Sequence, residues 1–179
     1  DLSLIQQYDP VTVSKNLFLA DIYPAYRYDG WQNKNVVNAG MNPPGGVVIN
    51  YYLKNLSDTS SVTITIRDKN KKDIKKFSTK HSGEIEKLEA TSGMNQFVWD
   101  MYYLPAEKVD GMILWNGNVD GPRAAPGKYY VEIKSGNDIS EKEFEIKANP
   151  VYKCTQAEYE AQFEFLISVR DKFSEVQKT

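Results

Sequence analysis

Three carboxylates in the middle of the chain, Asp100, Asp110 and Asp120, lie among aromatic residues and are the candidates for acid and base chemistry. A glycosidase needs two such groups about 5–9.5 Å apart, one to protonate the leaving oxygen and one to act as nucleophile or base. Spacing along the chain sets no such distance, and carboxylates are common on any soluble surface. We therefore expect surface groups here and assign no catalytic residue.

The segment 116–121, Asn-Gly-Asn-Val-Asp-Gly, matches the first half of a calcium-binding loop. Oxygens at alternate positions, here Asn116, Asn118 and Asp120, can surround a hard cation. The twelfth position is Gly127, where such loops carry a bidentate Glu. We expect a plain turn, and neither a metal nor a cofactor is assigned. A single His81 and a single Cys154 also exclude a histidine-based site and an internal disulfide framework.

Aromatic and polar side chains that suit carbohydrate binding occur together in loop-like segments. Flat rings stack on the apolar faces of sugars, while arginine binds the hydroxyl groups. The candidates are Trp31, Tyr102, Tyr103, Trp115 and Arg123. The alternative is that these aromatics attach the flanking segments to the main domain, since aromatic side chains usually contribute buried area.

These candidates must be positioned by residues 46–150, where apolar and polar residues alternate. Alternation over 47–53, 62–67 and 128–134 predicts half-buried strands, separated by turn residues at 68–71 and 135–138. Five or six short strands with no helix between them predict a mainly β fold, an antiparallel sandwich of the immunoglobulin or fibronectin type. The long connection 102–126 interrupts the strands, and loops of this length are usually functional or docked against a neighbour.

Two flanking segments differ from this domain. Residues 1–45 are rich in proline and aromatics without regular periodicity, which predicts an irregular N-terminal strap that packs on the sandwich or on a preceding domain. In residues 151–179, Thr155 and Glu158 form a capping-box pattern that predicts a C-terminal amphipathic helix. Its apolar stripe consists of Tyr159, Phe163, Leu166, Val169, Phe173 and Val176.

The apolar stripe of this helix is expected to be a packing face. It would cover either a second helix beyond Thr179 or a neighbouring domain. In the chain as given we expect the stripe to be partly exposed, which would permit a dimer through the helix.

Composition restricts the partners. The chain has 179 residues with 22 Lys and Arg against 24 Asp and Glu, a net charge of -2, so no overall charge favours nucleic acid. No apolar run approaches the roughly 20 residues that span a bilayer. The chain begins at Asp1 without a signal-peptide pattern, and we interpret it as a fragment or a mature form.

Three segments resemble one family when taken together: 42–53 (NPPGGVVINYYL), 93–101 (GMNQFVWDM) and 121–131 (GPRAAPGKYYV). The set resembles the C-terminal immunoglobulin-like region of large secreted bacterial proteins that carry BNR/Asp-box β-propeller repeats and are described as glycosyl hydrolases. The last two segments also resemble the immunoglobulin-like domain of the flagellar hook-capping protein. The resemblance covers Trp31 to Val176.

The resemblance implies a non-catalytic accessory module that follows a propeller in a periplasmic or cell-surface protein. The upstream propeller of the same chain would then be its partner and would hold any active site. No Asp-box pattern occurs in these 179 residues, so the resemblance transfers no catalytic residue. A carbohydrate-binding module, with a polysaccharide as partner, is the alternative function.

Overall fold

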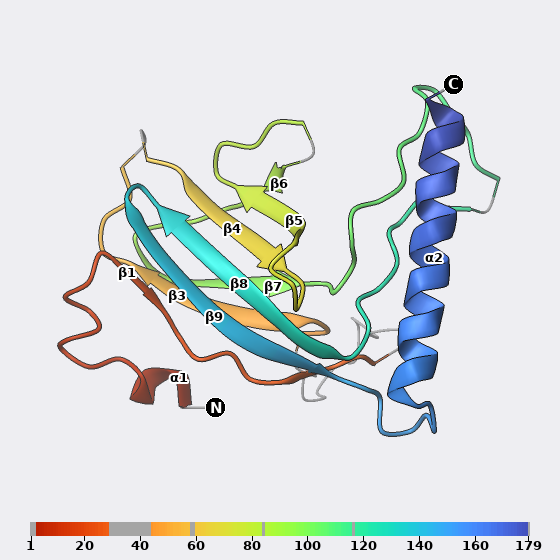
Figure 1. Ribbon diagram of the computed structural model, residues 1–179. Coiled ribbons are helices and arrows are strands. Elements are labelled where there is room, and N and C mark those ends of the chain that lie inside the picture. Colours follow the sequence, from red (N-terminus) through yellow and green to blue (C-terminus); the bar gives the residue numbers. More distant parts are fainter. Residues whose placement is uncertain (1–2, 29–43, 58–59, 84, 116, 179) are drawn as a thin grey trace, which may run out of the picture.

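The computed structural model describes residues 3–28, 44–57, 60–83, 85–115 and 117–178. Over these residues the protein is mainly β, with two sheets and one long C-terminal helix (Figure 1), as the sequence predicts. The elements in chain order are α1 (Ser3–Gln6), β1 (Leu17–Leu19), β2 (Ala25–Tyr26), β3 (Val47–Leu53), β4 (Val62–Arg67), β5 (Asp73–Ser78), β6 (Glu86–Lys87), β7 (Gly93–Trp99), β8 (Gly127–Ser135), β9 (Asp138–Lys147) and α2 (Gln156–Gln177).

The smaller sheet has the strand order β1-β3-β7, and both of its pairings are antiparallel. Burial alternates along β3, where Val47, Ile49, Tyr51 and Leu53 are buried and the residues between them are partly exposed. This confirms the half-buried strand predicted from the alternation of residue types. One face of β3 therefore belongs to the core and the other approaches solvent.

The larger sheet has the order β2-β9-β8-β4-β5-β6 and is mixed. Its four central strands pair antiparallel, as expected, but β2 pairs in parallel with β9 and β6 pairs in parallel with β5. The prediction of antiparallel pairing throughout is therefore wrong at both edges. Neither of these two-residue strands is joined to its partner by a hairpin, so no turn imposes an antiparallel arrangement.

Side chains from both sheets form one hydrophobic core. Trp99 at the end of β7 is fully buried and makes edge-on contacts with Tyr129 of β8 and Phe144 of β9, each with ring centroids 6.0 Å apart. Phe97 of β7 contacts Phe77 of β5 at 4.6 Å. Such aromatic pairs add to the stabilisation gained from buried area, so β7 is fixed firmly against the larger sheet.

The described part of the N-terminal strap, residues 3–28, contributes to both sheets. Its strand β1 pairs with β3 of the smaller sheet, and its strand β2 pairs with β9 of the larger one. The ring of Tyr8 packs against Phe18 and Tyr52, with centroid distances of 5.5 and 6.3 Å. Aromatic contacts and backbone pairing thus attach this segment to the β-sheets.

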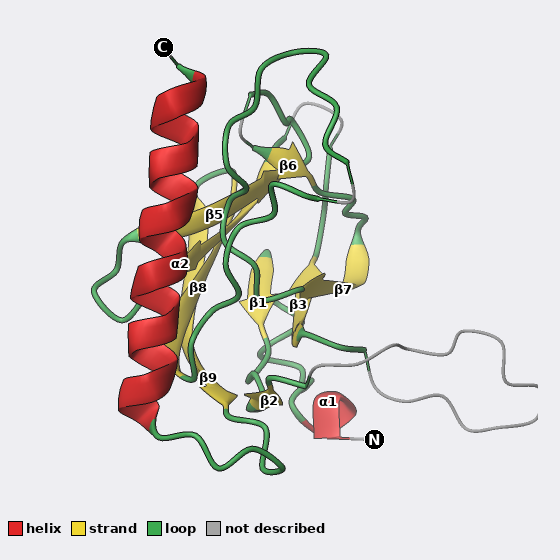
Figure 2. Ribbon diagram, turned by 90° about the vertical axis from the view of Figure 1, so that its right-hand side faces the viewer, coloured by secondary structure: helices red, strands yellow, loops and turns green. Residues whose placement is uncertain are grey.

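Helix α2 begins at the predicted capping box. The Thr155 side chain accepts a hydrogen bond from the backbone N–H of Glu158, and the Glu158 carboxylate accepts one from the backbone N–H of Thr155. Figures 1 and 2 show the helix standing beside the sheets, with the connection between β7 and β8 running along it. Tyr159 is the buried residue of this helix, and its other side chains are partly or largely exposed. Within the described residues, no helix has the length and apolarity to cross a bilayer.

Candidate functional site

Residues 100–126, which connect β7 to β8 and are called the excursion below, form an irregular double-stranded ribbon. The backbone N–H of Ala124 donates to the carbonyl of Met101 at 2.7 Å, and that of Tyr103 donates to Pro122 at 3.0 Å. Further out, the N–H of Ala106 donates to the carbonyl of Val119 at 2.7 Å. The two limbs of the excursion therefore support each other, and this part of the long connection has a defined shape.

The base of the excursion is fixed to the core. The indole N–H of Trp99 donates to the carbonyl of Tyr102 at 3.2 Å, and the Asp100 carboxylate accepts the backbone N–H of Tyr102 at 3.0 Å. Between them Met101 is fully buried and has a φ of 68°, a left-handed conformation that non-glycine residues rarely adopt. The surrounding contacts impose this sharp change of direction on the chain.

Gly121 allows the two limbs to approach closely. A Cβ atom at this position would lie 2.3 Å from the carbonyl oxygens of Tyr103 and Leu104. Backbone atoms on the facing limb cannot move away as a flexible side chain could. Glycine is thus required here because of close backbone approach.

The excursion also holds α2. The Arg170 guanidinium donates to the carbonyl of Leu104 at 3.1 Å, and the ring of Tyr103 packs on Phe163 with centroids 4.7 Å apart. Burial raises the pKa of the Tyr103 hydroxyl, which therefore stays protonated at neutral pH. Near the C-terminus, Lys178 forms an ion pair with Glu107 at 2.8 Å. These contacts place the helix and the excursion side by side along most of their length.

A groove of about 440 Å³ lies between α2 and the excursion, and we call it the α2 groove. Leu166, Val169 and Phe173 line it from the helix, and Tyr102 and Val119 line it from the excursion. Polar residues that line it are Arg27, Asn118, Asp120, Arg123 and Arg170. The groove therefore combines apolar surface with guanidinium groups, a combination common in sites for organic ligands.

Arg123 and Tyr102, two of the predicted carbohydrate-binding residues, meet in the α2 groove. They face each other across the ribbon, and the Arg123 guanidinium carbon lies 6.0 Å from the centre of the Tyr102 ring. Arg123 also donates a hydrogen bond to the carbonyl of Tyr28 at 2.7 Å. Its charge is thus held at one side of the groove, beside an aromatic ring that is partly exposed.

The other predicted carbohydrate-binding residues are placed elsewhere. Tyr103 packs against Phe163 of α2 and is only partly exposed. Trp115 lies near the tip of the excursion and has 97% of its surface exposed, and it is not among the residues that line the α2 groove. Trp31 lies outside the described residues. The predicted set is thus split between a groove and an exposed tip.

The predicted acidic and metal-ligating residues also lie in different places and do not form one site. Asp100 supports the turn at the base of the excursion, whereas Asp120 lines the α2 groove and Asp110 is exposed near the tip. Asn118 accepts the backbone N–H of Asp120 at 3.3 Å, which is a turn contact. Asn116 lies outside the described residues. In the part of the chain that the structure describes, no three His, Cys, Asp or Glu residues gather as metal ligands do.

Arg27 and Arg170 were not predicted as site residues, although both line the α2 groove. Arg27 follows β2 in the strap, and Arg170 lies among the apolar residues of α2. Neither has a local sequence signal, because only the packing of α2 against the excursion and the end of β2 brings them together.

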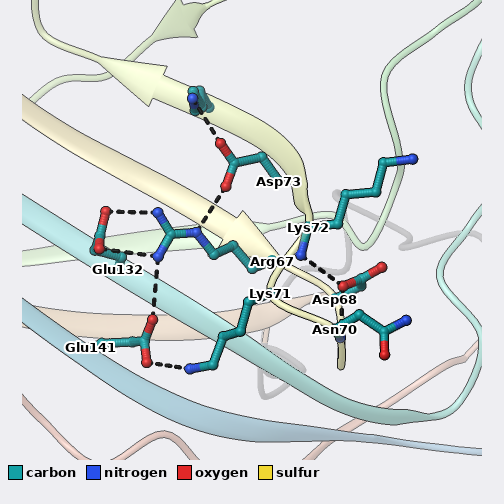
Figure 3. Close-up of polar contacts among 9 residues, drawn as sticks. Arg67, Asp68, Asn70, Lys71, Lys72, Asp73, Glu132 and Glu141 are labelled. Atoms are coloured by element: carbon teal, nitrogen blue, oxygen red, sulfur yellow. Dashed lines mark hydrogen bonds and ion pairs between the residues drawn. The ribbon is translucent and has the colours of Figure 1, made fainter.

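A second polar cluster lies on the larger sheet around Arg67 (Figure 3). The Arg67 guanidinium donates to both carboxylate oxygens of Glu132 at 3.0 Å each and to Asp73 at 2.8 Å. Glu141 accepts from Arg67 at 3.2 Å and also pairs with Lys71. The cluster joins β4, β5, β8 and β9 through ion pairs between its own residues. We therefore interpret it as a structural feature that stabilises the sheet.

Comparison of the chain with models of known protein families gives no match. Comparison with curated proteins likewise gives no relative.

Proposed function

We propose that the chain is a non-catalytic accessory module of a larger secreted protein, with a periplasmic or cell-surface location and a β-propeller of the BNR type as its neighbour. The observation that carries this proposal is the apolar tip of the excursion. Ile113 and Trp115 have 92% and 97% of their surfaces exposed, and Val109 in the same loop is also exposed. Several exposed apolar side chains in one short loop are typical of a contact surface.

The scaffold around the tip supports this role. The limbs of the excursion pair with each other, and α2 supports them through Arg170 and through the ion pair between Glu107 and Lys178. A docking loop that is already ordered loses less conformational entropy when it binds. The tip is therefore suited to attach the module to a neighbouring domain.

An immunoglobulin-like sandwich is the fold that we propose for the β-domain. Two sheets with mostly antiparallel pairing share one core, and a fully buried tryptophan lies between them, which supports this proposal. The resemblance of segments 93–101 and 121–131 to the hook-capping domain also supports an immunoglobulin-like fold.

The docking role is tested by replacing Ile113 and Trp115 together with serine. In the parent protein we expect faster proteolysis of the junction with the preceding domain, because the apolar contact is lost. The isolated chain should keep its melting temperature, since both side chains are already exposed. Ile139→Ser, at an exposed position on β9, is the matched control. Equal proteolysis of the tip variant and the wild-type parent would contradict the docking role.

Carbohydrate binding is the second candidate function, favoured by the meeting of Tyr102 and Arg123 in the α2 groove. Affinity electrophoresis of the chain against a panel of polysaccharides tests it, with Tyr102→Ala and Trp115→Ala alongside. Trp31→Ala belongs in the same series. Retardation on a glycan that a folded variant loses would support binding, and free migration on every glycan would exclude this candidate.

A further inference from the structure

The charge of the α2 groove differs in sign from that of the whole chain. Three arginines line it, Arg27, Arg123 and Arg170, and Asp120 is the carboxylate that lines it with them. The chain as a whole carries a net charge of -2. Guanidinium groups from three distant segments thus create a positive groove on an acidic protein, which favours an anionic ligand.

Contacts with the protein backbone hold these arginines in place. Arg27 reaches the carbonyl of Ala124 at 3.5 Å and lies over the ring of Tyr159, 5.5 Å from its centre. Arg170 is held by the carbonyl of Leu104 at 3.1 Å and also pairs with the carboxylate of Asp171, to which its Nε donates at 2.8 Å. A backbone carbonyl is neutral, so the contact of Arg27 orients its guanidinium without cancelling its charge, whereas Asp171 offsets part of the charge of Arg170. A planar guanidinium fixed in this way is well suited to bind a carboxylate through two parallel hydrogen bonds.

The rest of the groove is apolar and aromatic. Leu166 and Phe173 line the helix side, and Tyr102 contributes a partly exposed ring. Such surface suits the apolar face of a sugar ring better than it suits a bare inorganic anion. A ligand that matches the groove therefore carries both a carboxylate and a ring.

A second hollow of about 370 Å³ continues along the same flank of α2, and Arg27 lines both. Tyr152, about half exposed, lines this second hollow together with Gln162 and with Glu158, whose carboxylate accepts the backbone N–H of Thr155 in the capping box. The two hollows together offer an aromatic ring and polar groups on either side of Arg27. This arrangement suits a chain of linked sugar units, with the carboxylate of one unit at Arg27.

We propose that the α2 groove binds an acidic polysaccharide built from hexuronic acid units. The proposal rests on the carbohydrate-binding candidate above and names its ligand class, and it is independent of the docking role of the excursion tip. An acidic peptide would also satisfy the arginines, but it lacks the flat apolar face that Tyr102 and Phe173 are placed to meet.

Affinity electrophoresis in polygalacturonate tests the proposal, with highly methyl-esterified polygalacturonate as the matched neutral ligand and poly-L-glutamate as the polyanion control. We expect retardation in polygalacturonate alone. Arg27→Gln should weaken binding about tenfold, because a charge-assisted hydrogen bond is lost. Lys134→Gln removes one positive charge from the exposed end of β8, away from the groove, and should leave binding unchanged.

Asp120→Asn should change the affinity for the polysaccharide in the opposite direction. Removal of this carboxylate should strengthen binding about two- to threefold by relieving repulsion of the ligand, and the gain should shrink as salt is added. Circular dichroism of each variant confirms that it is folded. A folded Arg27→Gln protein that binds as tightly as the wild type would overturn the assignment of the groove.

The three polymers test different parts of the proposal, so each negative result has its own meaning. Equal retardation in the methyl-esterified polymer would keep carbohydrate binding and overturn the inference about charge. Equal retardation in poly-L-glutamate would overturn the saccharide class in favour of general polyanion binding. Free migration in polygalacturonate would overturn this proposal, while retardation on a neutral glycan in the wider panel would still support the candidate function on which it rests.

Discussion

The indole N–H of Trp99 donates a hydrogen bond to the backbone carbonyl of Tyr102 across 3.2 Å, which connects the buried core directly to the first turn of the excursion. Trp99 packs between the sheets through Tyr129 and Phe144, whereas Tyr102 lines the α2 groove. The position of the groove wall thus depends on a residue of the core. Loss of this single bond should affect both stability and the shape of the groove.

Trp99→Phe is expected to lower the free energy of unfolding by about 2–4 kcal/mol, because it removes a buried donor and leaves space in the core. Urea denaturation followed by circular dichroism measures the change. Trp115→Phe is the matched control, since that ring is exposed and the same substitution should change stability by less than about 0.5 kcal/mol. Equal stability of the two variants would refute the role of Trp99.

Gly121→Ala is expected to destabilise the protein by about 1–3 kcal/mol, because the new methyl group would overlap two carbonyl oxygens of the facing limb. Gly117→Ala is the control, since the nearest atom to its added Cβ would be 3.9 Å away. Thermal unfolding of both variants should separate them clearly. Similar melting temperatures would show that the limbs do not approach as closely as described.

The Arg67 cluster should make stability depend on pH. Hydrogen bonds from Lys76 and Arg67 lower the pKa of Asp73, and a hydrogen bond from Lys71, joined by Arg67, lowers that of Glu141. A carboxyl whose folded-state pKa is lowered stabilises the fold fully above its unfolded-state pKa and loses that contribution as the pH falls through the folded value. The stabilisation by these two groups should therefore be complete above about pH 5 and decline below it.

Arg67→Met tests this dependence. At pH 7 it should lower the free energy of unfolding by about 1–3 kcal/mol, and the difference from the wild type should narrow between pH 5 and pH 3, about the range in which the carboxyls become protonated. Lys87→Met, which removes an exposed pair with Glu89, should leave stability unaltered at either pH. A constant difference between the Arg67 variant and the wild type across this range would contradict the electrostatic account.

The outer flank of α2 should mediate weak self-association. Phe165 and Val176 have 66% and 61% of their surfaces exposed, and Val169, which is about half exposed, lies at the border between this flank and the α2 groove. These positions recur with the spacing of a coiled-coil seam. In the C-terminal half of the helix, Arg170 pairs with Asp171 and Lys172 pairs with Glu175. The charges of that half are therefore largely balanced within one chain, and the association we expect is driven by the exposed apolar side chains.

Sedimentation equilibrium measures this association. We expect a dimer with a micromolar to millimolar dissociation constant, because one pair of helices buries less surface area than a standard protein interface does. Phe165→Glu should keep the chain monomeric, whereas Ile139→Glu on β9 should not. A wild-type protein that stays monomeric at millimolar concentration would rule out this dimer.

Local patterns predicted the central strands and the long helix. Alternating residue types predicted β3, and the Thr155 and Glu158 pair predicted the start of α2, because both signals depend only on neighbouring residues. The strands β2 and β6 have two residues each, too few to show any periodicity. Their parallel pairing follows from long-range contacts, which the sequence pattern does not contain.

The candidate site could be predicted only in part, for a similar reason. Tyr102 and Arg123 come from the two limbs of one excursion, so their residue types within a single segment already indicate both. Arg27 and Arg170 reach the groove from the strap and from α2. Their role depends on how three separate segments pack, and the spacing along the chain gives no measure of it.

The two-residue strands β2 and β6 have a further consequence for behaviour at high concentration. They occupy the outer positions of the six-stranded sheet, so that sheet ends on each side in a very short ladder. A short edge offers few backbone groups to another molecule and is a common protection against edge-to-edge aggregation. The two short strands cover only part of their neighbours, since β2 pairs with Ile146 and Lys147 alone of the ten residues of β9. The rest of β9 is rich in charged residues, among them Glu141, Lys142 and Glu143, which should oppose the intermolecular pairing that leads to fibrils.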